Sequence, residues 1–176
     1  MDLPDGVRLT PLKMHADERG WVMEIFRSEW DVTHPSRQWN AGVSGPNVMR
    51  GAHVHLKHTD YLAVLDGRVS IGLFDLRPRS RAYRKSALVE LSDRRPAAIT
   101  LPNGVLHAIY SHEATMHVYG LDHYYDPGDD LACRWDDPAL GIAWPCTDPV
   151  LSDRDRSAGS LAEIEATLRR MNVEFA

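Results

Sequence analysis

Short apolar segments interrupted by turn residues constrain this chain more than any other feature. From Gly20 to Leu121, runs of β-branched, aromatic and aliphatic residues alternate with Gly, Pro, Asn or Asp about every eight to twelve positions. This spacing is typical of an all-β sandwich or barrel, and no helical periodicity competes with it. The sequence therefore predicts an all-β fold.

The strongest local signal is an Asp-Gly pair, Asp66-Gly67, between apolar runs at 61–65 and 68–74. Such a pair between two strand-like segments predicts a β-hairpin. Further strands are expected at 21–27, 48–54, 86–91, 98–101, 106–111 and 116–124, each bounded by turn-forming residues.

The last third of the chain is different. After Asp126-Pro127-Gly128, repeated prolines make long regular elements improbable, so this segment is expected to pack as a covering tail anchored by Trp135 and Trp144. Ser160 and Glu163 match a capping box in front of an apolar-periodic stretch. They predict one short C-terminal helix.

Composition excludes several classes of protein. The 176 residues carry a formal net charge of -5, without runs of like charge, which argues against a nucleic-acid-binding surface. No apolar stretch approaches the roughly 20 residues of a membrane span, and the N-terminus lacks signal-peptide features. The two cysteines are too few for a disulfide framework, so we expect a reduced, cytoplasmic protein. The length predicts one domain, 1–176.

Histidines concentrate where strands are expected. His53 and His55 are two residues apart and so share one strand face, Asp60 follows, and His107 begins a later strand. This spacing resembles the metal-binding motifs of the cupin superfamily, in which Asp60 would take the position of the acidic ligand. Three imidazoles and a carboxylate suit a divalent transition metal such as Fe, Mn, Ni, Co or Zn. Alternatively, His55 and His58 are ordinary polar strand residues.

Short motifs along nearly the whole chain are more specific. They are Asp17-Glu18-Arg19-Gly20 with Glu24; Gln38-x-Asn40; Arg50-Gly51-x-His53; Asp75-x-Arg77 with Ser80; Leu101-Pro102-x-Gly104-x-x-His107; Tyr119; Tyr124-Tyr125-x-Pro127; Trp135-x-Asp137-Pro138-x-x-x-Ile142-x-Trp144-Pro145; and Leu151-Ser152-x-x-Asp155. In these motifs and their order, the chain resembles the dTDP-4-dehydrorhamnose 3,5-epimerase family. The resemblance implies a cupin-type jelly-roll β-barrel, a homodimer and a nucleotide-diphosphate sugar as substrate.

The resemblance also implies a reaction. A 4-keto-6-deoxy sugar nucleotide has acidic hydrogens beside its ketone, so inverting carbon 3 or carbon 5 takes a base on one face, an acid on the other and stabilisation of the enolate. The family pattern makes His53 the general base, Asp155 the carboxylate that orients it, and Tyr119 the acid. No cofactor is expected for this reaction.

Substrate-binding roles follow from the same pattern. Arg19 and Arg50 are expected to hold the diphosphate, a task that suits the guanidinium group. The expected lining of the sugar and nucleotide pocket is Glu24, Gln38, Asn40, His107 and Tyr125.

The family pattern breaks at one place. The resemblance implies a lysine that points at the sugar ketone, but His58 and Asp60 fall where the family has Gln and Lys. A carboxylate beside a developing oxyanion reverses the sign of the local field. Lys57 could supply the missing charge from the loop.

A bound metal could also supply that charge, with His53, His55, Asp60 and His107 as ligands. His53 would then be unable to act as the free base. Three hypotheses follow: an epimerase, a metal-dependent cupin enzyme of the keto-sugar isomerase or oxidase type, or a non-catalytic sugar-nucleotide binder. The pair Asp129-Asp130 is interpreted as a solvated turn without a role.

Overall fold

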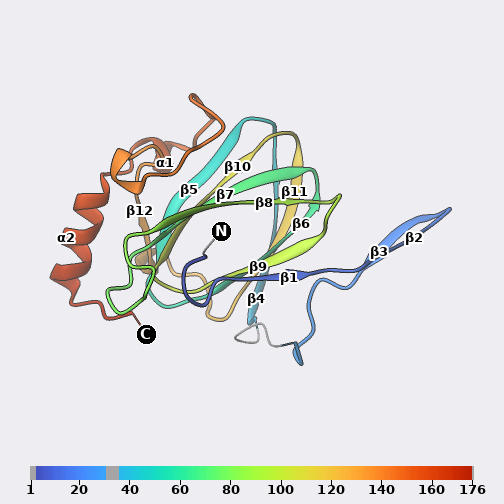
Figure 1. The fold of residues 1–176 in the computed structure, drawn as a ribbon, viewed down its shortest axis with the longest axis horizontal. Helices are drawn as coiled ribbons and strands as arrows, with labels where there is room; N and C mark the ends of the chain where they lie inside the picture. The colour runs from blue at the N-terminus through green and yellow to red at the C-terminus, as the bar shows by residue number, and fades with distance from the viewer. Residues whose placement is uncertain (1–2, 31–35, 176) are drawn as a thin grey trace.

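Two five-stranded antiparallel sheets face each other in the computed structural model, which describes residues 3–30 and 36–175 (Figure 1). The β6 sheet has the order β1 (Arg8–Pro11), β9 (Ala97–Leu101), β6 (Asp60–Asp66), β11 (Thr115–Leu121) and β4 (Gln38–Ser44). The β5 sheet has the order β12 (Asp130–Ala132), β5 (Val48–His55), β10 (Val105–Ser111), β7 (Arg68–Asp75) and β8 (Ser86–Ser92). From β4 to β12 most consecutive strands alternate between the sheets, which is a jelly-roll arrangement and confirms the predicted fold class.

The Asp66-Gly67 turn exists, but the predicted hairpin is wrong. Strand β6 pairs with β9 and β11, whereas β7 pairs with β8 and β10, so the turn connects two different sheets. Gly67 has φ +80°, and a Cβ there would lie 2.3 Å from the carbonyl oxygen of Ala114. An Asp-Gly signal encodes a reversal of the chain. It does not encode which strands then pair.

Other differences concern strand boundaries. The strands expected at 21–27 and 116–124 end earlier, with β3 (Gly20–Met23) and with β11 at Leu121. Strands β1, β2 (Met14–Asp17), β4 and β12 are absent from the prediction. Strand β4 shows why: its alternate residues Gln38, Asn40 and Gly42 carry no hydrophobic signal, although the strand pairs with β11 along its length.

The two larger of the three core clusters in the described residues both include residues of strand β10. Between the sheets, Ile71 and Leu73 of β7 pack with Leu62 of β6 and Ile99 of β9. Side chains on the other face of the β5 sheet pack instead against the C-terminal tail. The inner layer leaves one part of the interior to polar side chains.

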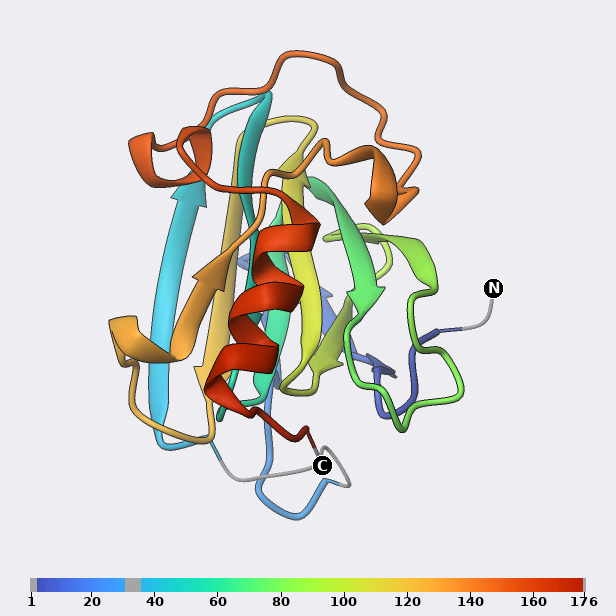
Figure 2. The same ribbon diagram turned by 90° about the vertical axis from the view of Figure 1, so that its left-hand side faces the viewer.

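The tail covers the outer face of the β5 sheet, as the sequence predicts. It contains η1 (Pro127–Asp129), η2 (Pro138–Leu140), α1 (Asp153–Arg156) and α2 (Leu161–Met171). Figure 2 shows α2 lying across this face, which buries Leu161, Ile164 and Leu168. Ser160 and Glu163 form the predicted capping box. Within the described ranges, the helices are too short or too polar to cross a bilayer.

Strands β2 and β3 form a separate two-stranded sheet that projects from the barrel (Figure 1). Trp21 and Val22 on β3 are 50% and 67% exposed. These two apolar side chains lie on the part of the chain that stands furthest from the barrel.

Candidate active site

A cavity of about 750 Å³ lies between the sheets. Its walls come from β4, β6 and β11 on one side, from β5 and β10 on the other, and from the tail at 150–155. Polar residues from distant parts of the sequence therefore meet in one cavity. Such a concave, partly apolar space with convergent polar groups is the usual form of a small-molecule site.

A β-bulge in β5 determines which side chains reach this cavity. Arg50 pairs with Ile109 and His53 with His107, so one residue more lies on β5 than on β10 between these positions. Gly51 permits the bulge with φ +112°, where a Cβ would lie 2.8 Å from the carbonyl oxygen of His107. The extra residue brings Arg50 and His53, three positions apart, to the same cavity.

His53 and Asp155 form a closely bonded pair at the cavity wall. His53 Nε2 is 2.6 Å from Asp155 Oδ1, and the backbone N–H of Gly51 donates to Asp155 Oδ2 at 3.4 Å. Burial raises the pKa of the Asp155 carboxyl, but the contacts with His53 and Gly51 outweigh it and leave the pKa below its usual value. The ionised carboxylate therefore accepts the Nε2–H of His53, which leaves Nδ1 as the basic nitrogen.

Tyr119 lines the same cavity from the opposite sheet. Burial, followed by the charge of Asp60, raises the pKa of its phenol. The phenol is therefore protonated at neutral pH and able to donate a proton.

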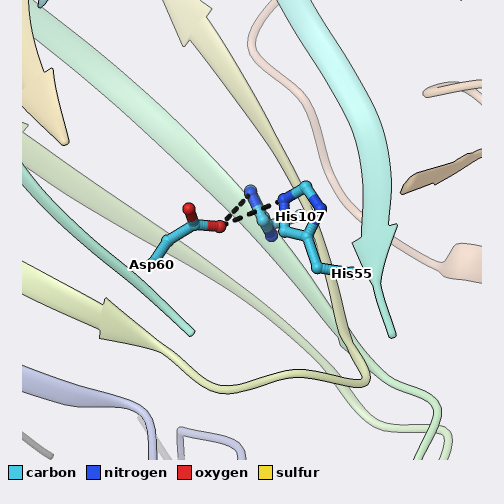
Figure 3. A group of neighbouring side chains, drawn as sticks. All are labelled: His55, Asp60 and His107. Atoms are coloured by element: carbon cyan, nitrogen blue, oxygen red, sulfur yellow. Dashed lines mark ion pairs between the residues drawn. The ribbon is translucent and has the colours of Figure 1, made fainter. Parts of the chain in front are cut away.

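His55, Asp60 and His107 form a buried cluster in this cavity, shown in Figure 3. Asp60 Oδ2 is 3.1 Å from His55 Nε2 and 3.5 Å from His107 Nε2. The ligand atoms of the three residues all lie within 4.8 Å of one another. His53, the fourth predicted ligand, is outside this cluster and bonded to Asp155.

Burial and charge set the protonation of the cluster. Burial raises the pKa of the Asp60 carboxyl, but His55 and His107 outweigh it and lower the pKa overall. Burial lowers the pKa of His55, but Asp60 and Asp130 outweigh it and raise the pKa overall. Burial lowers the pKa of His107 to about 4, so that this imidazole is neutral at physiological pH.

The interpretation of Asp129-Asp130 as a solvated turn is wrong. Asp129 is 1% exposed and its carboxylate contacts His58 Nδ1 at 2.9 Å, while Asp130 Oδ1 lies 3.4 Å from His55 Nδ1. Arg154 donates to Asp130 Oδ2 at 2.8 Å. In the sequence, two aspartates after Pro-Gly are indistinguishable from a surface turn, because only the pairing of β12 with β5 buries them.

His58 and His117 also belong to the site, although the sequence assigns neither residue a role. The His58 ring stacks on that of His55 with centroids 3.9 Å apart, and the side chain is 1% exposed. His117 lines the cavity beside Tyr119, and burial lowers its pKa to about 4. Lys57 does not reach the cavity, because its side chain is 62% exposed and its ammonium lies 3.7 Å from Asp126.

The predicted substrate-binding residues fall into two groups. Arg50, His107 and Tyr125 line the cavity. Gln38 donates to Asn40 and accepts from the backbone N–H of Tyr125, next to the cavity wall.

The other predicted residues lie outside the cavity. Arg19, between β2 and β3, is 83% exposed and pairs with Asp17, while Glu24 after β3 pairs with Arg27. In this chain, the predicted roles of Arg19 and Glu24 in substrate binding stay predictions.

Comparison with known proteins decides the family. The family model described as dTDP-4-dehydrorhamnose 3,5-epimerase matches residues 1–163. The chain belongs to this epimerase family. A dTDP-4-dehydrorhamnose 3,5-epimerase of Neisseria gonorrhoeae is 32% identical over 176 residues, covering 96% of this chain, which spans 53% of that relative's length.

Two solved structures of epimerases are similar over most of their length. A dTDP-6-deoxy-D-glucose-3,5-epimerase from Legionella pneumophila, in complex with dTDP-4-keto-L-rhamnose, has a TM-score of 0.84 and 29% identity, covering 93% of this chain and 92% of its own. A 3'-monoepimerase from Streptomyces bikiniensis, in complex with dTDP-quinovose, also has a TM-score of 0.84 and 29% identity, covering 97% and 89%. Epimerases of one and of two sugar centres are thus equally similar to this chain.

Proposed function

We propose that this chain is an isomerase that epimerises a dTDP-linked or other nucleotide-linked 4-keto-6-deoxy sugar at carbon 3, carbon 5 or both. The observation that carries the proposal is the placement of the His53–Asp155 pair and Tyr119 in opposite walls of one cavity. Inversion requires proton removal and proton return on opposite faces of the sugar, and this arrangement supplies a base on one side and an acid on the other.

The chemistry uses groups of the chain itself. His53 Nδ1 takes the proton from the carbon beside the ketone, and the electron pair of the broken C–H bond moves into an enolate. Asp155 stabilises the imidazolium through the bond to Nε2. Tyr119 then gives its phenolic proton to the opposite face of that carbon and regains one from solvent, while the His53 imidazolium releases its proton to solvent. No organic cofactor takes part.

Arg50 suits the diphosphate of the substrate. Its guanidinium is at the cavity wall, where it donates to Ser44 Oγ and to the carbonyl oxygen of Val43, both at 2.9 Å. These bonds fix the orientation of the planar group. A guanidinium held in this way can present its remaining N–H groups to phosphate oxygens.

The test is deuterium wash-in from heavy water into a dTDP-linked 4-keto-6-deoxy sugar, followed by mass spectrometry. An epimerase of both flanking carbons incorporates two deuterons, and an epimerase of one centre incorporates one. The matched control is His53→Ala, in which incorporation should fall about 10²–10⁴-fold. Absence of incorporation with the wild-type chain would refute the proposal.

The second candidate is a non-catalytic sugar-nucleotide binder. It is favoured by Asp60, a carboxylate where the family pattern has the lysine, and by Lys57, which is directed to Asp126 instead of the cavity. Calorimetric binding of dTDP-sugar without deuterium wash-in would select this candidate.

We also propose that the chain works as a homodimer. The projecting sheet of β2 and β3 exposes Trp21 and Val22 and carries Arg19 away from the cavity of its own chain. A second copy would cover the two apolar side chains and provide a cavity for Arg19 to reach. Sedimentation equilibrium should give twice the chain mass, and Trp21→Glu together with Val22→Glu should give a monomer. A monomeric wild-type chain at micromolar concentration would refute this.

A further inference from the structure

Asp60 Oδ2 is a buried acceptor that faces two imidazole ring nitrogens. The Asp60 residue is 5% exposed, and within the described residues Oδ2 has no hydrogen bond of acceptable geometry, even though two ring nitrogens lie within 3.5 Å. An unpaired buried carboxylate oxygen is costly. A group that satisfies it must come from outside the chain or from a proton shared with the imidazoles.

The orientation of His107 favours a cation. Its Nδ1 is 3.2 Å from the backbone carbonyl oxygen of Val105, an acceptor, so Nδ1 must carry the hydrogen. In the neutral ring, Nε2 then presents a lone pair, and this nitrogen faces Asp60 Oδ2 at 3.5 Å. Two lone pairs aimed at one another repel unless a positive ion lies between them.

His55 supplies a third donor in the same space. Its Nε2 is 3.1 Å from Asp60 Oδ2, while its Nδ1 lies 3.4 Å from Asp130 Oδ1. Arg154 donates to the other oxygen of this carboxylate, Asp130 Oδ2, at 2.8 Å. Three ligands at 2.0–2.2 Å from one tetrahedral ion are separated by about 3.4 Å. The observed separations of 3.1 and 3.5 Å bracket that value.

We propose that His55 Nε2, Asp60 Oδ2 and His107 Nε2 bind one divalent transition metal ion. Two imidazoles and one carboxylate select ions such as Zn²⁺, Co²⁺, Ni²⁺ or Fe²⁺ over Mg²⁺ and Ca²⁺, which prefer oxygen ligands. His53 is not part of the ligand set, because the ligand atoms that lie within 4.8 Å of one another belong to His55, Asp60 and His107. The remaining side of the cluster faces the cavity.

The outer contacts match those of a metal site. The carbonyl oxygen of Val105 orients His107, and Asp130 faces the outer nitrogen of His55. Histidine ligands in proteins have such a carboxylate or carbonyl on the second ring nitrogen. When bound, the ion would supply positive charge to the cavity in which the family's lysine is replaced.

The test is Co²⁺ binding to chelator-stripped protein, without substrate. Wild-type protein should bind one ion per chain, seen by elemental analysis after gel filtration and by visible absorption bands of an imidazole-bound Co²⁺. His55→Ala and His107→Gln should weaken binding beyond the roughly 10–100-fold loss typical of an outer-contact variant, and Asp130→Asn should fall within that range.

Two controls separate the site from its neighbours. His53→Ala removes an imidazole two positions away on the same strand, and His112→Ala removes one that contacts Ser70 away from the cavity. Both should retain one Co²⁺ per chain. Circular dichroism of each metal-free variant verifies folding, and the near-isosteric His107→Gln keeps the test available if His55→Ala unfolds.

The result that overturns the inference is equal Co²⁺ affinity in wild-type, His55→Ala and His107→Gln, or no stoichiometric binding to the wild-type chain. Loss of Co²⁺ in His53→Ala would also overturn the assigned ligand set. The inference is independent of the proposed epimerisation, because wash-in reports proton transfer and Co²⁺ binding needs no sugar. Either can fail while the other stands.

Discussion

The cavity holds two groups of imidazole and carboxylate that differ in how far the chain satisfies them. The His53–Asp155 pair is complete: its contact is 2.6 Å, and the carboxylate accepts a backbone N–H as well. The cluster around Asp60 leaves buried polar atoms of Asp60, Asp130 and His55 without hydrogen bonds in the described part of the chain.

The difference shows that similar residues two positions apart on one strand can have different tasks. A satisfied carboxylate fixes one tautomer and one orientation of its histidine, which is what a base requires. An incompletely satisfied cluster is poised to take up an ion. In this structure, His53 contacts Asp155 and lies outside the cluster around Asp60.

The variant His53→Ala is expected to have the largest effect, because it removes the pair and leaves the cluster around Asp60 in place. Because the base is lost, kcat for wash-in should fall about 10²–10⁴-fold, the usual contribution of general acid–base catalysis. Co²⁺ affinity should stay at the wild-type value. Near-full activity in this variant would remove His53 from the mechanism, and simultaneous loss of both properties would show that pair and cluster are one unit.

Tyr119→Phe tests the opposite wall. The base still removes the proton, but no acid returns one to the other face. Inversion should therefore fall about 10²-fold, while deuterium still enters with retention, because His53 exchanges its proton with solvent. The measurement is the ratio of wash-in to epimer formed, by mass spectrometry and NMR. A ratio equal to that of the wild-type enzyme would argue against Tyr119 as the acid.

Much of this arrangement could be predicted from the sequence, because its signals are local. The barrel follows from strand spacing, and the C-terminal helix from the Ser160–Glu163 capping box. That His53 and His55 share one face follows from the period of a strand. The motif order was sufficient to name the family.

The remainder depends on contacts between distant segments. The bulge at Gly51 sets the phase of Arg50 relative to His53, and it arises only when β5 pairs with β10. Asp129 and Asp130 are buried because β12 adds to the edge of β5. A turn signal at Asp66-Gly67 likewise cannot reveal that its strands belong to different sheets.

Metal binding should raise the thermal stability of every variant in which the cluster around Asp60 is intact, whether or not the His53–Asp155 pair is present. An ion present at a hundred times its Kd stabilises the folded state by about 2.7 kcal/mol, which raises Tm by about 5–10 °C in a chain of this size. Calorimetry with Co²⁺ should show this shift in wild-type and His53→Ala protein, but not in His55→Ala. An equal shift in all of them would place the binding elsewhere.

The smallest expected effect concerns pH and belongs to the His53–Asp155 pair alone. The pKa of Asp155 is lowered in the folded chain, so its carboxylate contributes stability above the unfolded value of about 3.9. That contribution is lost as pH falls through the folded pKa. The difference in free energy of unfolding between wild-type and Asp155→Asn protein should be present above about pH 4 and shrink as pH falls below that value. Urea unfolding of metal-free protein across this range measures it, and a difference that stays constant down to pH 3 would contradict the ionised pair on which the base assignment depends.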